Sequence, residues 1–443
     1  MDHSPFSILP PELIEKIFSE CLPDIPSFKT CHAPLLLTHV CHTWRSIAKD
    51  TPRLWSHVAI PCWTKCPSNV YELTRLWVSR TLNAPLDIDI SLYNEDAQVL
   101  ANSKEAENLD DLTNRLLALL VPHRSQIQSL WGVFPTSCLP LVGVQEMENM
   151  KRLFYYGTPK YDNLLRVTET FNTEDVETRL DLGHSKENLQ VLSVTDCSID
   201  INSILRQVQL THLELFDLHR STLMCQETAF KILQSLPNLQ KCVLELFKNE
   251  RIAWNRQSHR LALGNLELLF LIWIFPADIT ILLDSIAAPN LIRLGIRGTP
   301  TVGMWNGLYD FLQSSRPPLL RLTLGNLEDV DIRLLDCLKC CPLLTHLSIS
   351  HSLLPEGLFP SLTLKGEAWN MELLPRLEIF TVAFCAGLKA TTVAACLASR
   401  AQDELAGFRR LQEVEIIKCV HITQNDVPIL LQCGVQKLTL KIL

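Results

Sequence analysis

One short apolar pattern recurs ten times between residues 188 and 443. Its first copy, NLQVLSV, places Leu189, Leu192 and Val194 at spacings of three and two residues. A repeat of this kind predicts one supersecondary unit stacked many times, because no single unit can bury its own apolar face. Successive copies are 21 to 34 residues apart, and their first apolar positions are Leu189, Leu210, Leu239, Leu266, Leu291, Leu319, Leu344, Leu377, Leu411 and Val435.

Each copy is expected to form a short strand that is followed by a helix. The leucines of the L-x-L core alternate with other residues, which places them on one face of a strand. Segments such as QETAFKILQSLPNL then show helical spacing and end in a proline. Proline cannot continue a helix and restricts the residue before it, so Pro237, Pro289 and Pro342 are expected to mark the return to the next strand.

This pattern resembles a leucine-rich repeat. In three copies a cysteine follows the last apolar strand residue by three positions, as in the cysteine-containing kind of this repeat; these are Cys197, Cys385 and Cys419. Other copies have neither Cys nor Asn at that position, and the spacing varies. The resemblance implies an α/β fold in which the strands form an irregular, horseshoe-shaped solenoid with these cysteines facing inward.

Size and composition narrow the class of protein. With 443 residues, of which 47% are hydrophobic and 20% charged, the chain can build a large core, and a solenoid can extend that core repeat by repeat. The formal net charge of −8 argues against a nucleic-acid partner bound through a basic surface. Residues 1–10 lack a secretory signal, and the longest apolar run, Leu268–Phe275, is too short to span a membrane. We therefore expect an intracellular protein of the cytoplasm or nucleus, whose 16 cysteines are free thiols.

The N-terminal stretch predicts two amphipathic helices. The segment ILPPELIEKIFSECL begins with a proline pair, which suits the first turn of a helix. Helices this short are not stable alone, so we expect them to pack on each other and on a partner. The apolar residues at helical spacing are Leu13, Ile17 and Phe18 in the first segment and Leu36, Val40, Trp44 and Ile47 in the second.

The same stretch resembles an F-box over about residues 8–60. The pattern is L-P-x-E-L-x-x-x-I-F, followed by V-C-x-x-W-R-x-I-A and by P-R-L-W. The chain departs from the commonest pattern by an insertion, Asp24–Pro34, between the first two helices. The matching positions are Leu9, Pro10, Glu12, Leu13, Ile17, Phe18, Val40, Cys41, Trp44, Arg45, Ile47, Ala48, Pro52, Leu54 and Trp55.

An F-box followed by leucine-rich repeats implies the substrate-recognition subunit of a Skp-cullin-F-box (SCF) ubiquitin ligase. By this resemblance the F-box docks on a Skp-family adaptor, the adaptor binds the cullin, and the repeats hold a protein substrate, with no catalysis and no cofactor in this chain. Val40 and Trp44 are read equally well as core residues of the helical domain. The residues that the resemblance assigns to adaptor contact or its support are Leu9, Pro10, Leu13, Ile17, Phe18, Val40, Trp44, Leu54 and Trp55.

We expect three parts: an all-helical F-box domain at residues 1–60, an irregular junction with the first repeats at 61–187, and the solenoid at 188–443. In the junction, TRLWVSRTL and NLDDLTNRLLALLVPH have helical spacing, with Asn108 or Asp110 as the cap and Pro122 as the end of the second helix. WSHVAI, PLDIDISL and QIQSLW are typical of strands. No Gly/Ser linker is present, so the F-box is expected to pack rigidly on the first repeats.

Other chemistries have less support in the sequence. Zinc sites usually show paired ligands at fixed spacing, which the candidate ligands here do not, so no metal is expected. Nucleotide-binding and hydrolase motifs such as the P-loop, G-x-G-x-x-G, G-x-S-x-G and H-E-x-x-H are absent from the sequence. An enzyme with an unrecognised thiol site is the remaining catalytic alternative. The candidate ligands are Cys31, His32, His39, Cys41 and His42, with Cys62, Cys66, Cys337, Cys340 and Cys341.

The sequence does not identify the substrate. Trp254, Trp305 and Trp369 lie between predicted strands, where they either contact a substrate or pack loops onto the solenoid. A basic patch for a phosphate is conceivable, although scattered charges are usually solvated; its members are Arg293, Arg297, Arg321 and Lys389. The alternative function is a non-catalytic leucine-rich-repeat scaffold or interaction protein without a role in a ligase.

Overall fold

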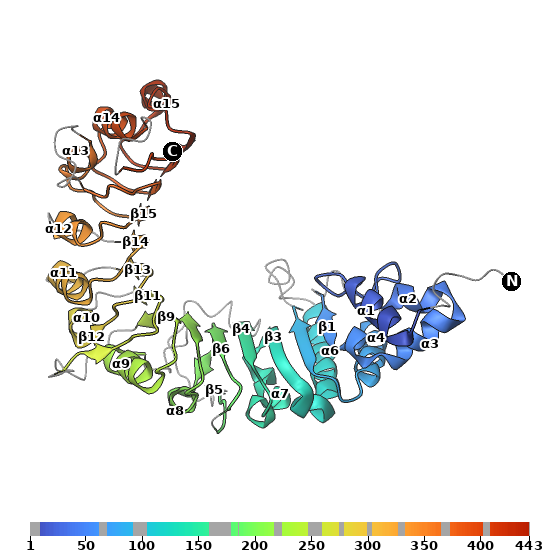
Figure 1. The fold of residues 1–443 in the computed structure, drawn as a ribbon. Helices are drawn as coiled ribbons and strands as arrows, with labels where there is room; N and C mark the ends of the chain where they lie inside the picture. Colours follow the sequence, from blue (N-terminus) through green and yellow to red (C-terminus); the bar gives the residue numbers. More distant parts are fainter. Residues whose placement is uncertain are drawn as a thin grey trace. The chain divides into compact units, whose positions relative to one another are not determined.

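The computed structural model describes residues 9–61, 69–91, 104–158, 179–184, 186–216, 224–246, 259–273, 279–298, 304–326, 333–364, 373–401 and 408–442. The chain divides into two compact units, Met1–Thr222 and Leu223–Leu443. Both units contain helices and a parallel sheet, and the first unit begins with a group of helices (Figure 1). The fold is therefore mixed α/β, with a helical N-terminal region.

The helical region consists of α1 (Pro11–Glu20), α2 (Leu35–Val40), α3 (His42–Asp50) and the 3₁₀ helix η2 (Pro52–Trp55). Pro11 occupies the first turn of α1, where its missing N–H has no partner to lose. Cys41 caps α3, since its Sγ accepts a hydrogen bond from the backbone N–H of Trp44 at 3.4 Å. Helix α3 packs against both α1 and α2, so the three short helices share one small core.

The parallel sheet of the first unit has the strand order β1-β2-β3-β4-β6-β8. Leu130, Leu153, Leu192 and Leu213 are aligned across β3, β4, β6 and β8, and all four are buried. Such a row of leucines fixes the register, because a slip by one residue would turn each of them to the other face. The remaining elements are β1 (His57–Ile60), α4 (Val70–Arg80), β2 (Leu86–Ile90), α6 (Lys104–Leu120), η4 (Val121–Gln126), β3 (Ile127–Pro135), η5 (Thr136–Cys138), α7 (Leu139–Val142), η6 (Val144–Glu146), β4 (Arg152–Thr158), β5 (Arg179–Leu180), β6 (Val191–Thr195), β7 (Ser198–Ile199), α8 (Ile201–Leu205) and β8 (His212–Phe216).

The second unit has the parallel order β9-β11-β13-β14-β15-β16-β17-β18. Most of its helices contact the next helix in the chain, and the helices lie on one side of the strands (Figure 1). On the opposite face, most of the described strand side chains are at least partly exposed. The elements are α9 (Gln226–Ser235), β9 (Lys241–Leu246), β10 (Leu261–Ala262), β11 (Leu268–Trp273), α10 (Thr280–Ser285), β12 (Ile286–Ala287), β13 (Arg293–Arg297), α11 (Met304–Ser315), β14 (Arg321–Gly325), α12 (Arg333–Lys339), β15 (His346–Ser350), α13 (Leu358–Leu362), β16 (Ile379–Ala383), α14 (Ala390–Arg400), β17 (Glu413–Ile417), η9 (Gln424–Asp426), α15 (Val427–Leu431) and β18 (Lys437–Lys441).

Every copy of the apolar pattern contains a strand, which begins two residues after the first apolar position. The three strands predicted upstream are β1, β2 and β3, and helices α9, α10 and α12 end before Pro237, Pro289 and Pro342. The predicted cap of the helix before Pro122 is wrong. Helix α6 begins at Lys104, upstream of Asn108 and Asp110, because the acidic residues in this stretch favour the first turn of a helix.

The turns after the strands share one backbone conformation. Asp196, Phe384 and Lys418 follow β6, β16 and β17 with φ values of 53°, 54° and 46°. Each is followed by one of the three predicted inward cysteines, and all three of these are buried. Cys385 Sγ lies 3.6 Å from the carbonyl oxygen of Ile349, on the preceding strand β15, and Cys419 repeats this contact with Val382 on β16. The buried thiols of Cys385 and Cys419 therefore link successive strands at their carboxyl ends.

Three aromatic side chains join the helical region to the first strands and helices of the sheet. Trp77 of α4 is buried, and its ring contacts Trp55 of η2 at 5.0 Å and Phe28 at 5.1 Å, both edge to face. Phe28 belongs to the inserted segment Asp24–Pro34, and Arg80 of α4 covers the other side of the Trp55 ring at 4.2 Å. The helical region is thus packed directly onto α4.

Replacing Trp77 with alanine is expected to weaken this junction. A buried tryptophan truncated to alanine costs about 3 to 5 kcal/mol, because contacts are lost and a cavity remains. Thermal or urea denaturation of the full chain should therefore show a lower midpoint for Trp77→Ala. The exposed neighbour gives the matched control, Leu76→Ala, which should change the free energy of unfolding by less than about 1 kcal/mol. Equal effects of the two variants would contradict a packed junction.

Candidate functional site

The helical region exposes aliphatic side chains that were predicted to face an adaptor. Leu13 and Ile17 of α1 are 48% and 37% exposed, and Val40 of α2 is 53% exposed. Leu36 of α2 is exposed as well, although it is not one of the predicted adaptor residues. Pro10 is exposed at the start of α1, and Leu9 before it is half-buried. Of the nine predicted adaptor residues, Leu9, Pro10, Leu13, Ile17 and Val40 are thus at least partly exposed.

The other four predicted residues lie inside the helical region. Phe18, Leu54 and Trp55 are buried, and Trp44 is half-buried with its ring 5.0 Å from that of Phe18. Trp55 Nε1 donates a hydrogen bond to the carbonyl oxygen of Ala48 at 2.7 Å, which satisfies its only polar group. These four side chains hold α1, α3 and η2 together and thereby help to position Leu13, Ile17 and Val40.

The open face of the first sheet carries a second group of exposed apolar side chains. Trp131 of β3, Tyr156 of β4 and Phe216 of β8 are 50%, 45% and 41% exposed. The rings of Trp131 and Phe154 stack, with centroids 5.1 Å apart and planes 25° apart. Trp131 is aligned with Phe154, and Tyr156 is aligned through β6 with Phe216. We call Trp131, Phe154, Tyr156 and Phe216 the aromatic face.

Two carboxylates flank the aromatic face in the same row. Asp89 of β2 is aligned with Trp131, and Glu214 of β8 is aligned through Ser193 with Phe154. Asp89 accepts a hydrogen bond from Ser91 Oγ at 2.8 Å, and Glu214 accepts one from Ser193 Oγ at 3.1 Å. Neither forms an ion pair with any cation among the described residues. Two carboxylates, each of which accepts a hydrogen bond from a serine hydroxyl, thus lie in the same row as Trp131 and Phe154.

The aromatic face was not predicted from the sequence because strand β4 was not predicted. In RLFYYGT the buried residues Leu153 and Tyr155 alternate with Phe154 and Tyr156, so both faces of the strand are apolar. The alternation of polar and apolar residues that marks a strand with one exposed face is absent. Tyr155 lies in the interior. Burial raises its pKa, and its hydroxyl donates a hydrogen bond to the carbonyl oxygen of Phe134 at 3.0 Å.

On the second sheet, the structure brings together part of the predicted basic patch. Arg293 and Arg321 are aligned neighbours on β13 and β14, and both are exposed. Arg297 lies at the other end of β13, with its stem over Gly325. Lys389 is instead paired with Glu356 at 3.1 Å, so it is not part of this row. Arg293 and Arg321 have no ion-pair partner in the part of the chain that the structure describes.

The remaining candidates from the sequence have structural settings. Trp305 is buried, and its carbonyl oxygen accepts from Cys337 Sγ at 3.8 Å. Trp254 and Trp369 lie outside the described residues, as do Cys62 and Cys66. Over the described ranges, no three His, Cys, Asp or Glu side chains come together as metal ligands. In the same ranges, no helix combines the length and apolar content that a bilayer crossing needs.

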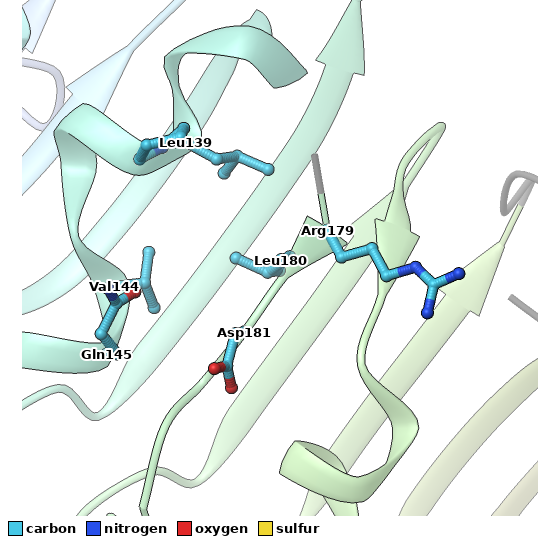
Figure 2. A pocket seen from close by; sticks show the side chains of 7 residues that line it. Leu139, Val144, Gln145, Arg179, Leu180 and Asp181 are labelled. Carbon is cyan, nitrogen blue, oxygen red and sulfur yellow. The ribbon is translucent and has the colours of Figure 1, made fainter. Parts of the chain in front are cut away.

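The helix side of the first sheet holds one shallow hollow. Its volume of about 190 Å³ is below the range of roughly 300 to 1,000 Å³ that is typical of small-molecule sites. Figure 2 shows Arg179 directed away from the hollow and Leu180 directed into it. Leu139, Val144 and Gln145 line the opposite wall. The hollow is therefore smaller than a typical pocket for a small-molecule substrate.

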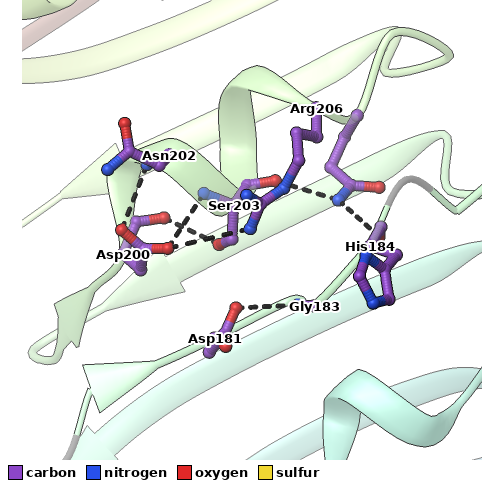
Figure 3. Close-up of polar contacts among 8 residues, drawn as sticks. Asp181, Gly183, His184, Asp200, Asn202, Ser203 and Arg206 are labelled. Carbon is purple, nitrogen blue, oxygen red and sulfur yellow. Dashed lines mark hydrogen bonds and ion pairs between the residues drawn. The ribbon is translucent and has the colours of Figure 1, made fainter.

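The polar residues beside this hollow stabilise the backbone. Asp200 caps α8, with its carboxylate accepting from the N–H groups of Asn202 and Ser203 at 3.2 and 3.1 Å (Figure 3). Gln207 is buried and donates to the carbonyl oxygens of His184 and Ser203, and its own amide oxygen accepts from a backbone N–H. This network shows the hydrogen bonding of a structural loop.

The buried thiols are held in the neutral form. Burial raises the pKa of Cys385 and of Cys396 to about 11. Burial also raises the pKa of Cys341 to about 12. Thiolate is the nucleophilic form, so these thiols are not activated at neutral pH. Their neutral form stabilises the fold below the ordinary thiol pKa of about 9, and this contribution is lost as the pH rises toward 11.

Iodoacetamide should therefore separate two classes of cysteine in the native chain at pH 8. We expect rapid alkylation of the exposed Cys21, Cys31 and Cys41 and none of Cys385 or Cys396. Peptide mass spectrometry at successive times measures this, with urea-denatured protein as the control in which all thiols react. Fast alkylation of Cys385 in the native chain would show that its thiol is accessible and ionised.

Comparison with known families identifies the helical region. Residues 6–61 match the family model described as F-box-like. No curated protein matches the chain significantly. F-box domains generally bind Skp-type adaptors, and such a domain indicates an adaptor or substrate-receptor role in SCF-type complexes. The α1–η2 region, with its exposed Leu13, Ile17 and Val40, is thus an F-box-like domain.

Proposed function

We propose that this chain is the non-catalytic substrate-recognition subunit of an SCF ubiquitin ligase. Its F-box-like domain docks on a Skp-family adaptor, which in turn binds the cullin, and the open sheet faces bind a protein substrate for ubiquitination. The observation that carries the proposal is the F-box-like match combined with exposed Leu13, Ile17 and Val40 on short, otherwise well-packed helices.

The helical region has a physical reason to bind a partner. Single exposed aliphatic residues are ordinary on a protein surface, but here one small domain exposes five: Leu13, Ile17, Ile25, Leu36 and Val40. Their burial at an interface gains about 25 cal/mol for each Å² of apolar surface removed from water. The side chains below them, Phe18 and Trp44, hold the helices in place. An adaptor would therefore meet a preorganised surface and would not have to order it.

Several features support the proposal that the sheets belong to an irregular leucine-rich-repeat solenoid. The strands are parallel and in register from repeat to repeat, and the helices of the second unit follow in chain order on one side. The inward thiols of Cys385 and Cys419 bond the carbonyl groups of the preceding strands, as a repeated position should. In this reading each repeat adds three outward side chains to an open face, which is where a protein substrate binds.

A receptor of this kind acts by positioning. It raises the effective concentration of the substrate at a distant catalytic site, and a flexible joint between adaptor and substrate would reduce that gain. The contacts of Trp77 with Trp55 and Phe28 provide a direct, packed joint between the F-box-like domain and the first sheet. This packing suits a receptor and is not required of a scaffold that binds one partner only.

The test is capture of the adaptor by the double variant Leu13→Glu, Val40→Glu. Two carboxylates in a desolvated apolar interface should lower affinity for a recombinant Skp-family adaptor at least tenfold, while the midpoint of thermal unfolding stays within a few degrees because both positions are exposed. Calorimetry or surface plasmon resonance measures the affinity. The control variant Leu431→Glu changes an equally exposed leucine of the second unit and should bind like the original chain.

The result also separates the receptor from a scaffold. A receptor brings down the cullin through the adaptor and supports ubiquitin transfer in a reconstituted ligase. If the unchanged chain fails to bind the adaptor, or if the double variant binds as well as the control, the proposed docking surface is wrong. Adaptor binding without cullin recruitment would instead identify an interaction protein that uses its F-box-like domain outside a ligase.

A further inference from the structure

We infer that the aromatic face binds an extended protein segment in which a lysine or arginine lies beside apolar residues. This inference rests on the proposed function, because it names the kind of substrate segment that the receptor would hold. It is carried by two observations on the open face of β2, β3, β4, β6 and β8: mutually aligned aromatic rings that are exposed or half-buried, and carboxylates in the same row that have no cation partner among the described residues.

The four aromatic rings form an apolar surface that is at least partly exposed. Trp131 and Phe154 stack on each other on adjacent strands, and Tyr156 stands two residues further along β4. Phe216 lies in the row of Tyr156, with Thr195 of β6 between them. Large exposed aromatics that lie together mark protein interaction sites, and tryptophan and tyrosine are the residues most enriched at the energetic centre of interfaces. Four such residues on one sheet face therefore indicate a binding surface.

The charges on this face select the sign of the partner. Arg152 is its one described basic side chain apart from the imidazoles of His57 and His212, and it already pairs with Asp87 at 3.4 Å. Among the described residues, Asp89 and Glu214 have serine hydroxyls and no cation as partners. A lysine or arginine of a partner would supply the missing cation, whereas a phosphorylated or acidic segment would be repelled.

The rings and the carboxylates can act on the same cation. Asp89 and Trp131 are aligned on adjacent strands, which are about 4.8 Å apart. A guanidinium or ammonium group over the face of Trp131 gains a cation–π contact and is still within reach of the Asp89 carboxylate. The flanking residues of the same segment then pack on Tyr156 and Phe216. A strand-like segment fits because the side chains of the face repeat at strand spacing along β4.

The second sheet differs, which makes it a suitable internal control. The aligned pair on its open face, Arg293 and Arg321, is basic, and no described rings stack beside it as Trp131 and Phe154 do on the first sheet. Phe384, an exposed aromatic in the turn after β16, stacks on His351 at 4.6 Å and has Lys418 at 6.0 Å. The neighbours of the Phe384 ring are thus basic side chains. Changing Phe384 therefore removes a similar ring without touching the aromatic face.

The experiment uses the full chain in complex with a Skp-family adaptor and two fluorescein-labelled dodecapeptide libraries. One library has a fixed central Arg-Leu pair and the other a fixed central Glu-Leu pair, with all other positions varied. We expect fluorescence anisotropy and selection to yield binders from the Arg-Leu library only. Their affinity should fall roughly tenfold or more in Trp131→Ala and in the double variant Asp89→Asn, Glu214→Gln, and should be unchanged in Phe384→Ala.

Each outcome decides the question. Binders from the Glu-Leu library of equal strength, no binders from the Arg-Leu library, or binding that survives both aromatic-face variants would overturn the inference. Circular dichroism and unfolding midpoints show that Trp131→Ala is folded, which is expected for a half-exposed side chain. Adaptor capture is recorded on the same samples, so a failure of the proposed function is seen separately from a failure of peptide binding.

Discussion

The registered rows of buried aliphatic side chains are the interaction on which both sheets depend. In the second unit, Leu294, Leu322 and Leu347 occupy one row that continues into Phe380 and Val414. Each of these side chains is buried between its own strand and the covering helices, so no repeat can fold without its neighbours. The inward cysteines Cys385 and Cys419 act at the carboxyl ends of the strands, where this register brings consecutive strands to the same level.

The same constraint leaves one face of each sheet free to carry function. Side chains alternate along a strand, so fixing the inward set for packing places no demand on the outward set. The first unit uses that freedom for aromatic rings and carboxylates, whereas β13 and β14 of the second unit use it for arginines, a threonine and glycines. A repeat fold can therefore support opposite recognition chemistries on neighbouring repeats. The hollow on the helix side has no such freedom, since its polar groups hold the backbone.

Much of the fold could be predicted because its signals are local and repeated. The L-x-x-L-x-L spacing predicted β6, β8, β9, β11 and β13 to β18, and the prolines predicted the ends of α9, α10 and α12. Strand β4 was missed because Phe154 and Tyr156 make its outward face as apolar as its inward one. In the helical region, periodicity identified the apolar stripe of α1 but did not separate exposed Leu13 from buried Phe18. That difference depends on where α3 and η2 pack, which is tertiary information.

The inserted segment Asp24–Pro34 shows how a local departure from a family pattern acquires a structural role. Sequence comparison alone marks it as extra residues in a loop. In the structure its Phe28 contacts Trp77 of α4, so the insertion spans the boundary between the helical region and the first sheet. Trp55, at the end of the F-box-like match, meets the same tryptophan from η2. Two contacts from different parts of the domain restrain rotation as well as separation, which one contact cannot do. The longer loop thus gives this domain a second point of attachment to the sheet.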